Sequence, residues 1–273
     1  MRRATLWHYL GVLFIMFWGL APFYWMVIVA LRDKRYTFDT TPWPTHVTLE
    51  NFQDALATDK GNDFLGAIGN SLLISIATTS LAVLVGVFTA YALARLNFPG
   101  KGLVTGIILA ASMFPGIALV TPLFQLFGDL GWIGTYRAMI IPNISFALPL
   151  TIYTLVSFFR QLPWELEEAA RVDGASRGQA FRLVLLPLAA PALFTTAILA
   201  FIATWNEFML ALTIIQTPTL RLLPVQIVYF VGIERLEMGP VMAFSVIVAV
   251  PAIILFSFAQ RSMVSGLMAG FSK

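Results

Sequence analysis

The charged residues that could do chemistry in this chain gather in one stretch, from Pro163 to Pro191. Long apolar segments lie on both sides of it, so we interpret it as a cytoplasmic docking element held between two membrane spans. Its carboxylates could pair with arginines of a docking partner. A surface loop whose amphipathic helices lie on the membrane would also explain these residues. The charged residues of the stretch are Glu165, Glu167, Glu168, Arg171, Asp173, Arg177 and Arg182.

The local pattern of this stretch predicts two short helices. The first runs from Trp164 to Val172 and ends at Asp173-Gly174, which is a turn signal. Ser176 can cap the second, which continues to Leu186. Its expected apolar face consists of Phe181, Val184 and Leu185, and Pro187 and Pro191 then lead into the next apolar segment.

A second group of polar residues interrupts apolar segments. Glu207, beside Asn206, lies sixteen residues after Pro191, which is roughly 24 Å along a helix and places it in the outer half of a span. Such a carboxylate faces the protein interior or water. Glu207 either lines a translocation path or pairs with a neighbouring helix at the interface.

Proline and glycine at Met113-Phe114-Pro115-Gly116 predict a kink near the middle of another apolar segment. A helix broken at that depth either borders a substrate cavity or is simply bent. We expect Asn206, Glu207, Met113 and Pro115 to line the path. Pro142, Pro149 and Pro251 lie in apolar segments too, and the same two interpretations apply to them.

Several chemistries are excluded by what the sequence lacks. It has no cysteine, and two separate histidines, His8 and His46, do not make a zinc site. Gly100-Lys101-Gly102 lacks the first glycine and the hydroxyl of a phosphate-binding loop. An enzyme embedded in the membrane would need paired catalytic groups within the spans, and Glu207 is the acid that clearly lies there. We therefore expect no covalent chemistry, metal or cofactor in this chain.

The elements that position these residues are membrane helices. Of the 273 residues 59% are hydrophobic and 11% charged, against roughly 25% charged in soluble domains. The mean hydropathy of +0.83 and the unbroken apolar runs predict an all-α, polytopic membrane protein. The first run is too long for a signal peptide and is expected to be a retained anchor. The six expected transmembrane helices are Leu6–Leu31, Ala67–Ala94, Leu103–Phe127, Ala138–Phe158, Pro191–Ile215 and Met238–Gln260.

Lysine and arginine placement predicts that both termini are cytoplasmic. This orientation puts ten of the 17 basic residues inside, although the cluster Arg32-Asp33-Lys34-Arg35 argues mildly against it. We expect residues 1–273 to form a single transmembrane domain. Its outer loop spans 32–66, its cytoplasmic loop 159–190 and its cytoplasmic tail 261–273. Within the outer loop, Thr48 could cap a short amphipathic helix that meets an external partner, or the loop is a solvated linker.

The charged stretch resembles the EAA loop of ABC importer permeases. That pattern is Glu-Ala-Ala, three residues, Gly, nine residues, an Ile-type residue, one residue and Leu-Pro. This chain matches it with Glu168-Ala169-Ala170, Gly174, Val184 and Leu186-Pro187, and Val184 in place of isoleucine is the one departure. The resemblance extends over nearly the whole chain to the shorter, six-span subunit of maltose-type sugar permeases. The other stretches that resemble it are Ala21-Pro22-Phe23-Tyr24-Trp25-Met26, Asn70-Ser71-Leu72, Ala90-Tyr91-Ala92-Leu93-Ala94-Arg95-Leu96, Trp205-Asn206-Glu207-Phe208 and Gly266-Leu267-Met268-Ala269-Gly270.

The resemblance implies a permease domain that couples to ATPase chains. Glu168 would make the charged contact with a nucleotide-binding subunit, and Ala169, Ala170 and Gly174 would allow close approach. The residues of this coupling site are Glu168, Ala169, Ala170, Asp173, Gly174, Arg177 and Pro187. The tail residues Gly266, Leu267 and Gly270 would reach between the ATPase chains.

By the same resemblance the partners are a second permease chain, two ATP-binding subunits, an external sugar-binding protein and membrane lipid, with no nucleic acid. ATP and Mg²⁺ would bind on the partner subunits. The substrate would be a disaccharide or oligosaccharide. A polyol, an amino sugar or a glycerol-phosphate compound would suit the same architecture, and a stand-alone channel or secondary transporter would not need the charged stretch.

Overall fold

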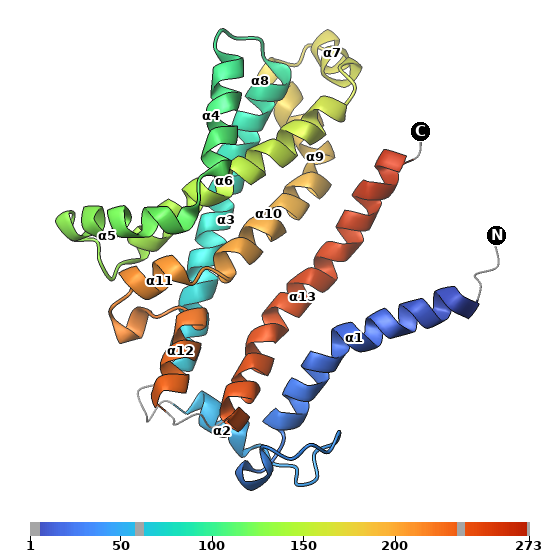
Figure 1. Ribbon diagram of the computed structural model, residues 1–273. Coiled ribbons are helices and arrows are strands. Elements are labelled where there is room, and N and C mark those ends of the chain that lie inside the picture. Colours follow the sequence, from blue (N-terminus) through green and yellow to red (C-terminus); the bar gives the residue numbers. More distant parts are fainter. Residues whose placement is uncertain (1–5, 58–62, 234–237, 272–273) are drawn as a thin grey trace. The chain divides into compact units, whose positions relative to one another are not determined.

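The computed structural model describes residues 6–57, 63–233 and 238–271. Regular structure over these ranges is helical, as predicted (Figure 1). The sheet-like pairing described there is one antiparallel bridge between Arg32 and Val47. The chain divides into two compact units, Met1–Ala67 with Leu223–Ala252, and Ile68–Leu222 with Ile253–Lys273. Each unit is built differently.

The first unit contains the first membrane helix and the segment that follows it. Its helices are α1 (Leu6–Ala30), the 3₁₀ turn η1 (Lys34–Tyr36), α2 (Glu50–Leu56), α12 (Leu223–Ile233) and the first half of α13 (Met238–Phe271). α3 (Phe64–Arg95) begins in this unit, and the Phe64 ring meets Phe244 edge-on at 3.7 Å between centroids.

The segment after α1 is folded around a buried arginine. Arg32 is fully buried, donates to the carbonyl oxygens of Asp39 and Thr41, and lies over the Trp25 ring at 5.1 Å. Buried Asn51 of α2 donates to the carbonyl oxygens of Ala30 and Arg32 at 2.9 and 2.6 Å. This stretch therefore has fixed internal contacts at Arg32 and Asn51, although most of its other described residues are exposed, as in a solvated linker.

α2 confirms the predicted short helix, though Thr48 caps it from one position further out than expected. The hydroxyl of Thr48 accepts from the Glu50 amide at 3.1 Å, while the N-cap position itself is Leu49. The structure does not test whether α2 meets an external partner.

The second unit is a helical bundle. After α3 come α4 (Lys101–Met113), η2 (Gly116–Leu119), α5 (Val120–Asp129) and α6 (Tyr136–Gln161). The charged stretch follows as α7 (Glu165–Val172), α8 (Arg177–Ala180), the π-turn η3 (Phe181–Leu185) and α9 (Leu186–Leu188). α10 (Ala190–Trp205), α11 (Met209–Ile214) and η4 (Pro218–Leu220) complete it.

Small residues let α3, α6 and α10 approach closely. Ala82, Ala147 and Ala200, one from each helix, form a buried cluster. A Cβ on Gly86 of α3 would lie 2.5 Å from the Thr151 methyl group of α6, so only glycine fits there. Close approach through small side chains is how membrane helices gain packing energy. α6 and α10 run side by side in Figure 1.

The predicted spans differ in how straight they are. Among the described residues, three helices are long and apolar enough to cross a bilayer: Trp7–Ala30, Phe64–Arg95 and Tyr136–Gln161. Two bent pairs bring the number to five, since α4 turns by 89° into Gly116–Asp129 and Arg177–Leu188 turns by 70° into α10. α13 is helical from Met238 to Phe271, and its described apolar part, Met238–Pro251, is shorter than a span.

Two segments that were predicted to be continuous helices are broken in the structure. The Leu103–Phe127 segment breaks at Phe114-Pro115, where the predicted kink is in fact a near right angle. The Pro191–Ile215 segment stops at Trp205 and resumes as α11, because Asn206, Glu207 and Phe208 leave the helix. By contrast, Pro142 and Pro149 lie inside an unbroken α6.

Candidate functional site

The charged stretch folds as a compact knob, defined here as residues 164–188. α7 ends at Asp173, and Gly174 adopts φ +91°, a conformation that favours glycine. Ser176 then begins α8 with a capping box, in which the Gln179 amide donates to Oγ at 3.3 Å and the Ser176 amide donates to the Gln179 side chain at 2.8 Å. The predicted two helices, turn and cap are confirmed, and the π-turn is an addition.

The inner face of the knob packs on α3 and α6. Phe181 and Leu185 are buried against Val87 and Ala90 of α3 and Phe159 of α6. The knob therefore shares a hydrophobic core with both helices. The Tyr91 ring of α3 lies 4.6 Å from that of Phe181. A displacement of the knob must consequently move these helices or break this packing.

Polar contacts also tie the base of the knob to α3. The Tyr91 hydroxyl donates to Oε1 of buried Glu167 at 3.0 Å, and the other carboxylate oxygen of Glu167 has no hydrogen-bond partner. Arg95 at the end of α3 donates to the Leu162 carbonyl at 2.6 Å and lies 4.4 Å above the Trp164 ring. Nε and Nη1 of Arg95 are buried without a partner.

Glu167 and its neighbour Glu168 were not distinguished from the sequence. Glu167 is 7% exposed whereas Glu168 is exposed. The signal that could have found this is the helical spacing, because Glu167 follows Leu166 and precedes Ala170 on the less exposed side of α7.

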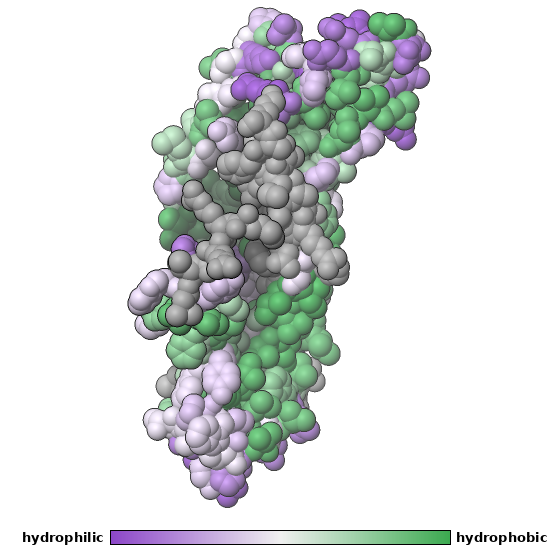
Figure 2. Space-filling view, turned by 90° about the vertical axis from the view of Figure 1, so that its right-hand side faces the viewer, coloured by the Kyte–Doolittle hydropathy of each residue, from purple (hydrophilic) through white to green (hydrophobic). Residues whose placement is uncertain are grey.

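The predicted coupling residues line the outer side of the knob. Ala170 is half-buried and the other six are exposed. Val172 is 87% exposed at the tip of α7, an unusual position for a valine. Figure 2 shows hydrophilic surface at the end of the molecule that carries α7. The exposed set is Glu168, Ala169, Asp173, Gly174, Arg177 and Pro187.

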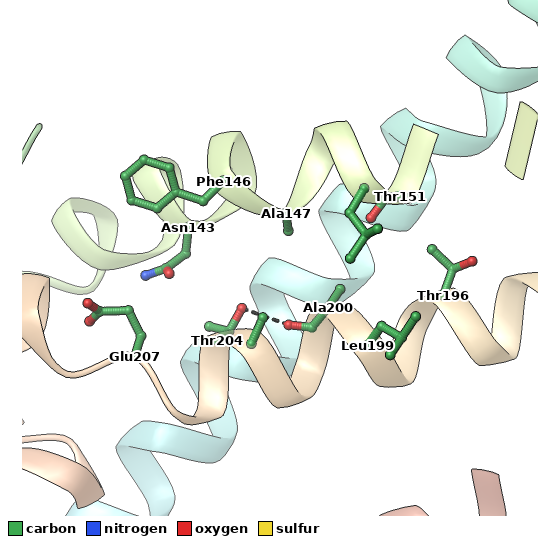
Figure 3. Close-up of a pocket in the computed structure, with 11 residues that line it drawn as sticks. Asn143, Phe146, Ala147, Thr151, Thr196, Leu199, Ala200, Thr204 and Glu207 are labelled. Carbon is green, nitrogen blue, oxygen red and sulfur yellow. Dashed lines mark hydrogen bonds between the residues drawn. The ribbon is translucent and has the colours of Figure 1, made fainter. Parts of the chain in front are cut away.

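A second site is a cavity of about 170 Å³ between α6 and α10 (Figure 3). Glu207 lies at one end of it, with both carboxylate oxygens bound by backbone, since Oε1 accepts from the Leu210 amide at 2.7 Å and Oε2 from the Ala211 amide at 3.0 Å. Glu207 thus caps α11. The cavity is lined by Asn143, Phe146, Ala147, Leu150, Thr151, Thr196, Leu199, Ala200, Ala203, Thr204 and Glu207.

The four residues expected along the path are not brought together. Glu207 lines the cavity, while Asn206 points elsewhere and donates to the Ile202 carbonyl at 2.8 Å. Met113 is 84% exposed at the end of α4, next to Pro115 at the break. Asn143 and Phe146 were not predicted as lining residues. The sequence alone does not show which side of the helix faces a cavity, either for a lone asparagine or for one phenylalanine among many apolar residues.

The tail residues Gly266, Leu267 and Gly270 belong to the last turns of α13, and their side chains lie outside the described residues. Among the described residues, no cluster of three or more histidine, cysteine or acidic side chains is suited to a metal ion.

Comparisons with known proteins agree with this architecture. The model of the family "binding-protein-dependent transport system inner membrane component" matches residues 82–267, a range that includes the knob. The trehalose transport system permease protein SugB of Mycobacterium tuberculosis is 43% identical, over 100% of this chain and 98% of that protein. The trehalose/maltose transport system permease protein MalG of Thermococcus litoralis is 40% identical, over 93% and 91%.

A solved bacterial ABC transporter involved in the import of the acidic polysaccharide alginate has a chain of similar fold. It superimposes with a TM-score of 0.78 at 22% identity, over 96% of this chain and 98% of that one. The family match covers more than half of the residues, and the two relatives align over more than nine tenths of their length. This chain therefore belongs to the family of binding-protein-dependent transport system inner membrane components.

Proposed function

We propose that this chain is the transmembrane subunit of an ATP-driven importer that carries a disaccharide or a short oligosaccharide across the cytoplasmic membrane. The observation that carries the proposal is the 43% identity to a trehalose permease over the full chain. The two relatives described above are both permeases for trehalose or for trehalose and maltose, which supports an uncharged disaccharide as the substrate class.

Family membership makes the chain a multi-pass component of the inner membrane and a transport subunit rather than an enzyme. We further propose that it has six spans in one domain with both termini in the cytoplasm. The three continuous apolar helices and the two bent pairs support most of this count, and α13 would supply the sixth. The segment 32–66 would then face outward, and 159–190 and 261–273 inward.

The knob is proposed to dock on an ATP-binding subunit. Its exposed carboxylate at Glu168 and its exposed valine at the tip are suited to a partner's guanidinium group and apolar cleft. Its inner face shares a core with α3 and α6, so a force on the knob would reach these spans. ATP and Mg²⁺ would bind on the partner chains.

The proposed assembly contains this chain, a second permease chain, two ATP-binding subunits and an external sugar-binding protein. The test is to tag this chain, extract it in mild detergent and identify by mass spectrometry what copurifies. Recovery of an ATPase chain and a second permease is the expected result. A stable oligomer of this chain alone would instead indicate a channel or secondary transporter.

The docking role has its own test. Glu168→Arg reverses the exposed charge without touching the buried face of α7, and we expect weaker recovery of the ATPase chain and loss of transport-coupled hydrolysis. Asp129→Arg, which reverses a charge at the end of α5, is the matched control. Intact assembly and intact coupled hydrolysis in Glu168→Arg would show that the knob does not dock through this residue.

A further inference from the structure

The cavity between α6 and α10 lies near the middle of a membrane span, where a polar side chain is energetically costly. Asn143 to Thr151 occupy the middle of the 26-residue α6. An ionisable or amide side chain at mid-span is costly unless it faces a protein interior or a cavity. Figure 3 shows Asn143 and Glu207 at the same end of the cavity, one from each side.

Three polar side chains of this lining direct a donor to the protein backbone. The hydroxyls of Thr196 and Thr204 donate to carbonyl oxygens of their own helix, at 2.7 and 3.0 Å, and Asn143 donates to the Met139 carbonyl at 2.8 Å. Glu207 is an acceptor, and each of its oxygens keeps a further lone pair beyond its backbone contact. A ligand that supplies many hydrogen-bond donors fits such a lining.

The charge and the shape of the cavity restrict the class of ligand further. No lysine or arginine lines the cavity, so nothing there would neutralise a phosphate, sulfonate or uronic acid beside Glu207. Phe146 adds a partly exposed aromatic ring, a surface on which the C–H face of a sugar can pack. The volume of about 170 Å³ is close to the roughly 150 Å³ of a protein cavity known to hold benzene, hence to one six-membered ring.

We propose that this cavity is a subsite for a single uncharged, hydroxyl-rich sugar ring, with Phe146 as the packing surface and Glu207 and Asn143 as polar contacts. The inference rests on the proposed function, because it assumes that a sugar passes this chain. It places part of the substrate contact on this subunit and assigns it to the face between α6 and α10.

The first test fills the cavity in the complete transporter, reconstituted in vesicles with its partner chains and binding protein, with trehalose and maltose as probes. Ala203 is an exposed lining residue, so Ala203→Trp closes the cavity without overpacking the core. We expect sugar uptake to fall about tenfold, which corresponds to ~1.4 kcal/mol, while hydrolysis stimulated by the loaded binding protein persists. Ile202→Trp, one residue away and outside the lining, is the control and should behave as wild type.

The second test removes atoms and so carries little risk to folding. Phe146→Ala should lower the sugar carried per ATP hydrolysed several-fold, and Tyr153→Ala, an exposed aromatic residue of α6 outside the lining, should not. If Ala203→Trp stops hydrolysis as well as uptake, Phe146→Ala decides alone. Unchanged uptake per ATP in Phe146→Ala would overturn the subsite while the importer function stands. A wild-type transporter that carries neither sugar would overturn the proposed disaccharide function and the subsite with it.

Discussion

Glu167 at the base of the knob is a buried carboxylate and Glu207 at the break after α10 is a half-buried one, and the two are held in different ways. Glu167 has one described partner, the Tyr91 hydroxyl from another helix, and one oxygen without a partner. Glu207 is held at both oxygens by backbone amides three and four residues further along its own chain. The contact at the knob joins two elements that could move apart, whereas the contact at the break fixes a local geometry.

This difference assigns separate tasks to the two regions. A single side-chain hydrogen bond between elements can be exchanged when the elements shift, and the unpartnered atoms of Glu167 and Arg95 offer alternative pairings. A carboxylate that caps its own helix moves only if that helix unwinds. We therefore expect variants at Glu207 to lower stability as well as to weaken the proposed sugar contact, and variants around Glu167 to affect mainly coupling.

The largest expected effect is at Glu207. Glu207→Ala leaves the buried amides of Leu210 and Ala211 without acceptors, and we expect a loss of about 2–4 kcal/mol in the free energy of unfolding. Glu207→Gln keeps one acceptor, so its free energy of unfolding should lie between those of wild type and Glu207→Ala. Thermal unfolding of the purified complex measures this, with Asn206→Ala as the neighbouring control. Equal melting temperatures for Glu207→Ala and wild type would mean that the cap does not hold the break.

The next effect is at the knob. Tyr91→Phe removes the described hydrogen bond to buried Glu167, which should cost about 1–3 kcal/mol. We also expect less sugar carried per ATP hydrolysed, because the hydroxyl joins the knob to α3. Tyr153→Phe removes an exposed hydroxyl and serves as the control.

Glu167→Gln sharpens this second prediction. The amide oxygen can still accept from Tyr91, so the variant should keep more of the coupling than Tyr91→Phe does. If Tyr91→Phe destabilises the complex and the ratio of sugar to ATP is unchanged, the contact is structural only and the contrast with Glu207 fails.

Features that depend on neighbouring residues could be predicted from the sequence. The two helices of the knob, the turn at Gly174 and the cap at Ser176 follow from residues within a few positions of each other. The kink at Pro115 follows from proline chemistry, although its size does not. The segment after Glu207 is as apolar as a membrane span, and hydropathy reports composition but not direction, so the break at residues 206–208 was missed.

Features that depend on contacts between residues far apart in the sequence could not be predicted. Helical spacing indicates that Glu167, not Glu168, lies on the less exposed side of α7, but its partner Tyr91 lies 76 positions earlier and could not be predicted. From the sequence, Arg32 was one charged residue of an outer loop. In the structure it is buried and donates to carbonyl groups seven and nine residues later. The cavity needs Asn143 and Glu207, which are 64 positions apart, to meet across two helices (Figure 3).

A smaller effect tests how far the knob depends on its own cap. Ser176→Ala removes the acceptor for the Gln179 amide and should cost about 1 kcal/mol. Hydrogen exchange of the amides at 177–180 should become faster, whereas Ser176→Asp should restore protection because aspartate also caps helices. Unchanged exchange in Ser176→Ala would mean that packing of Phe181 and Leu185 is sufficient to hold α8.

The smallest expected change in this chain's own stability is at Val172, and it is the most specific for docking. The side chain is 87% exposed, so Val172→Ser should alter the free energy of unfolding by no more than about 0.5 kcal/mol. If the knob docks in an apolar cleft, the same substitution should weaken recovery of the ATPase chain, since the valine is buried only in the complex. A variant that keeps both its stability and its partner would place the docking surface elsewhere on the knob, on the side of Arg177 and Pro187. Val47→Ser, at another exposed valine far along the chain, controls for general effects of removing surface hydrophobicity.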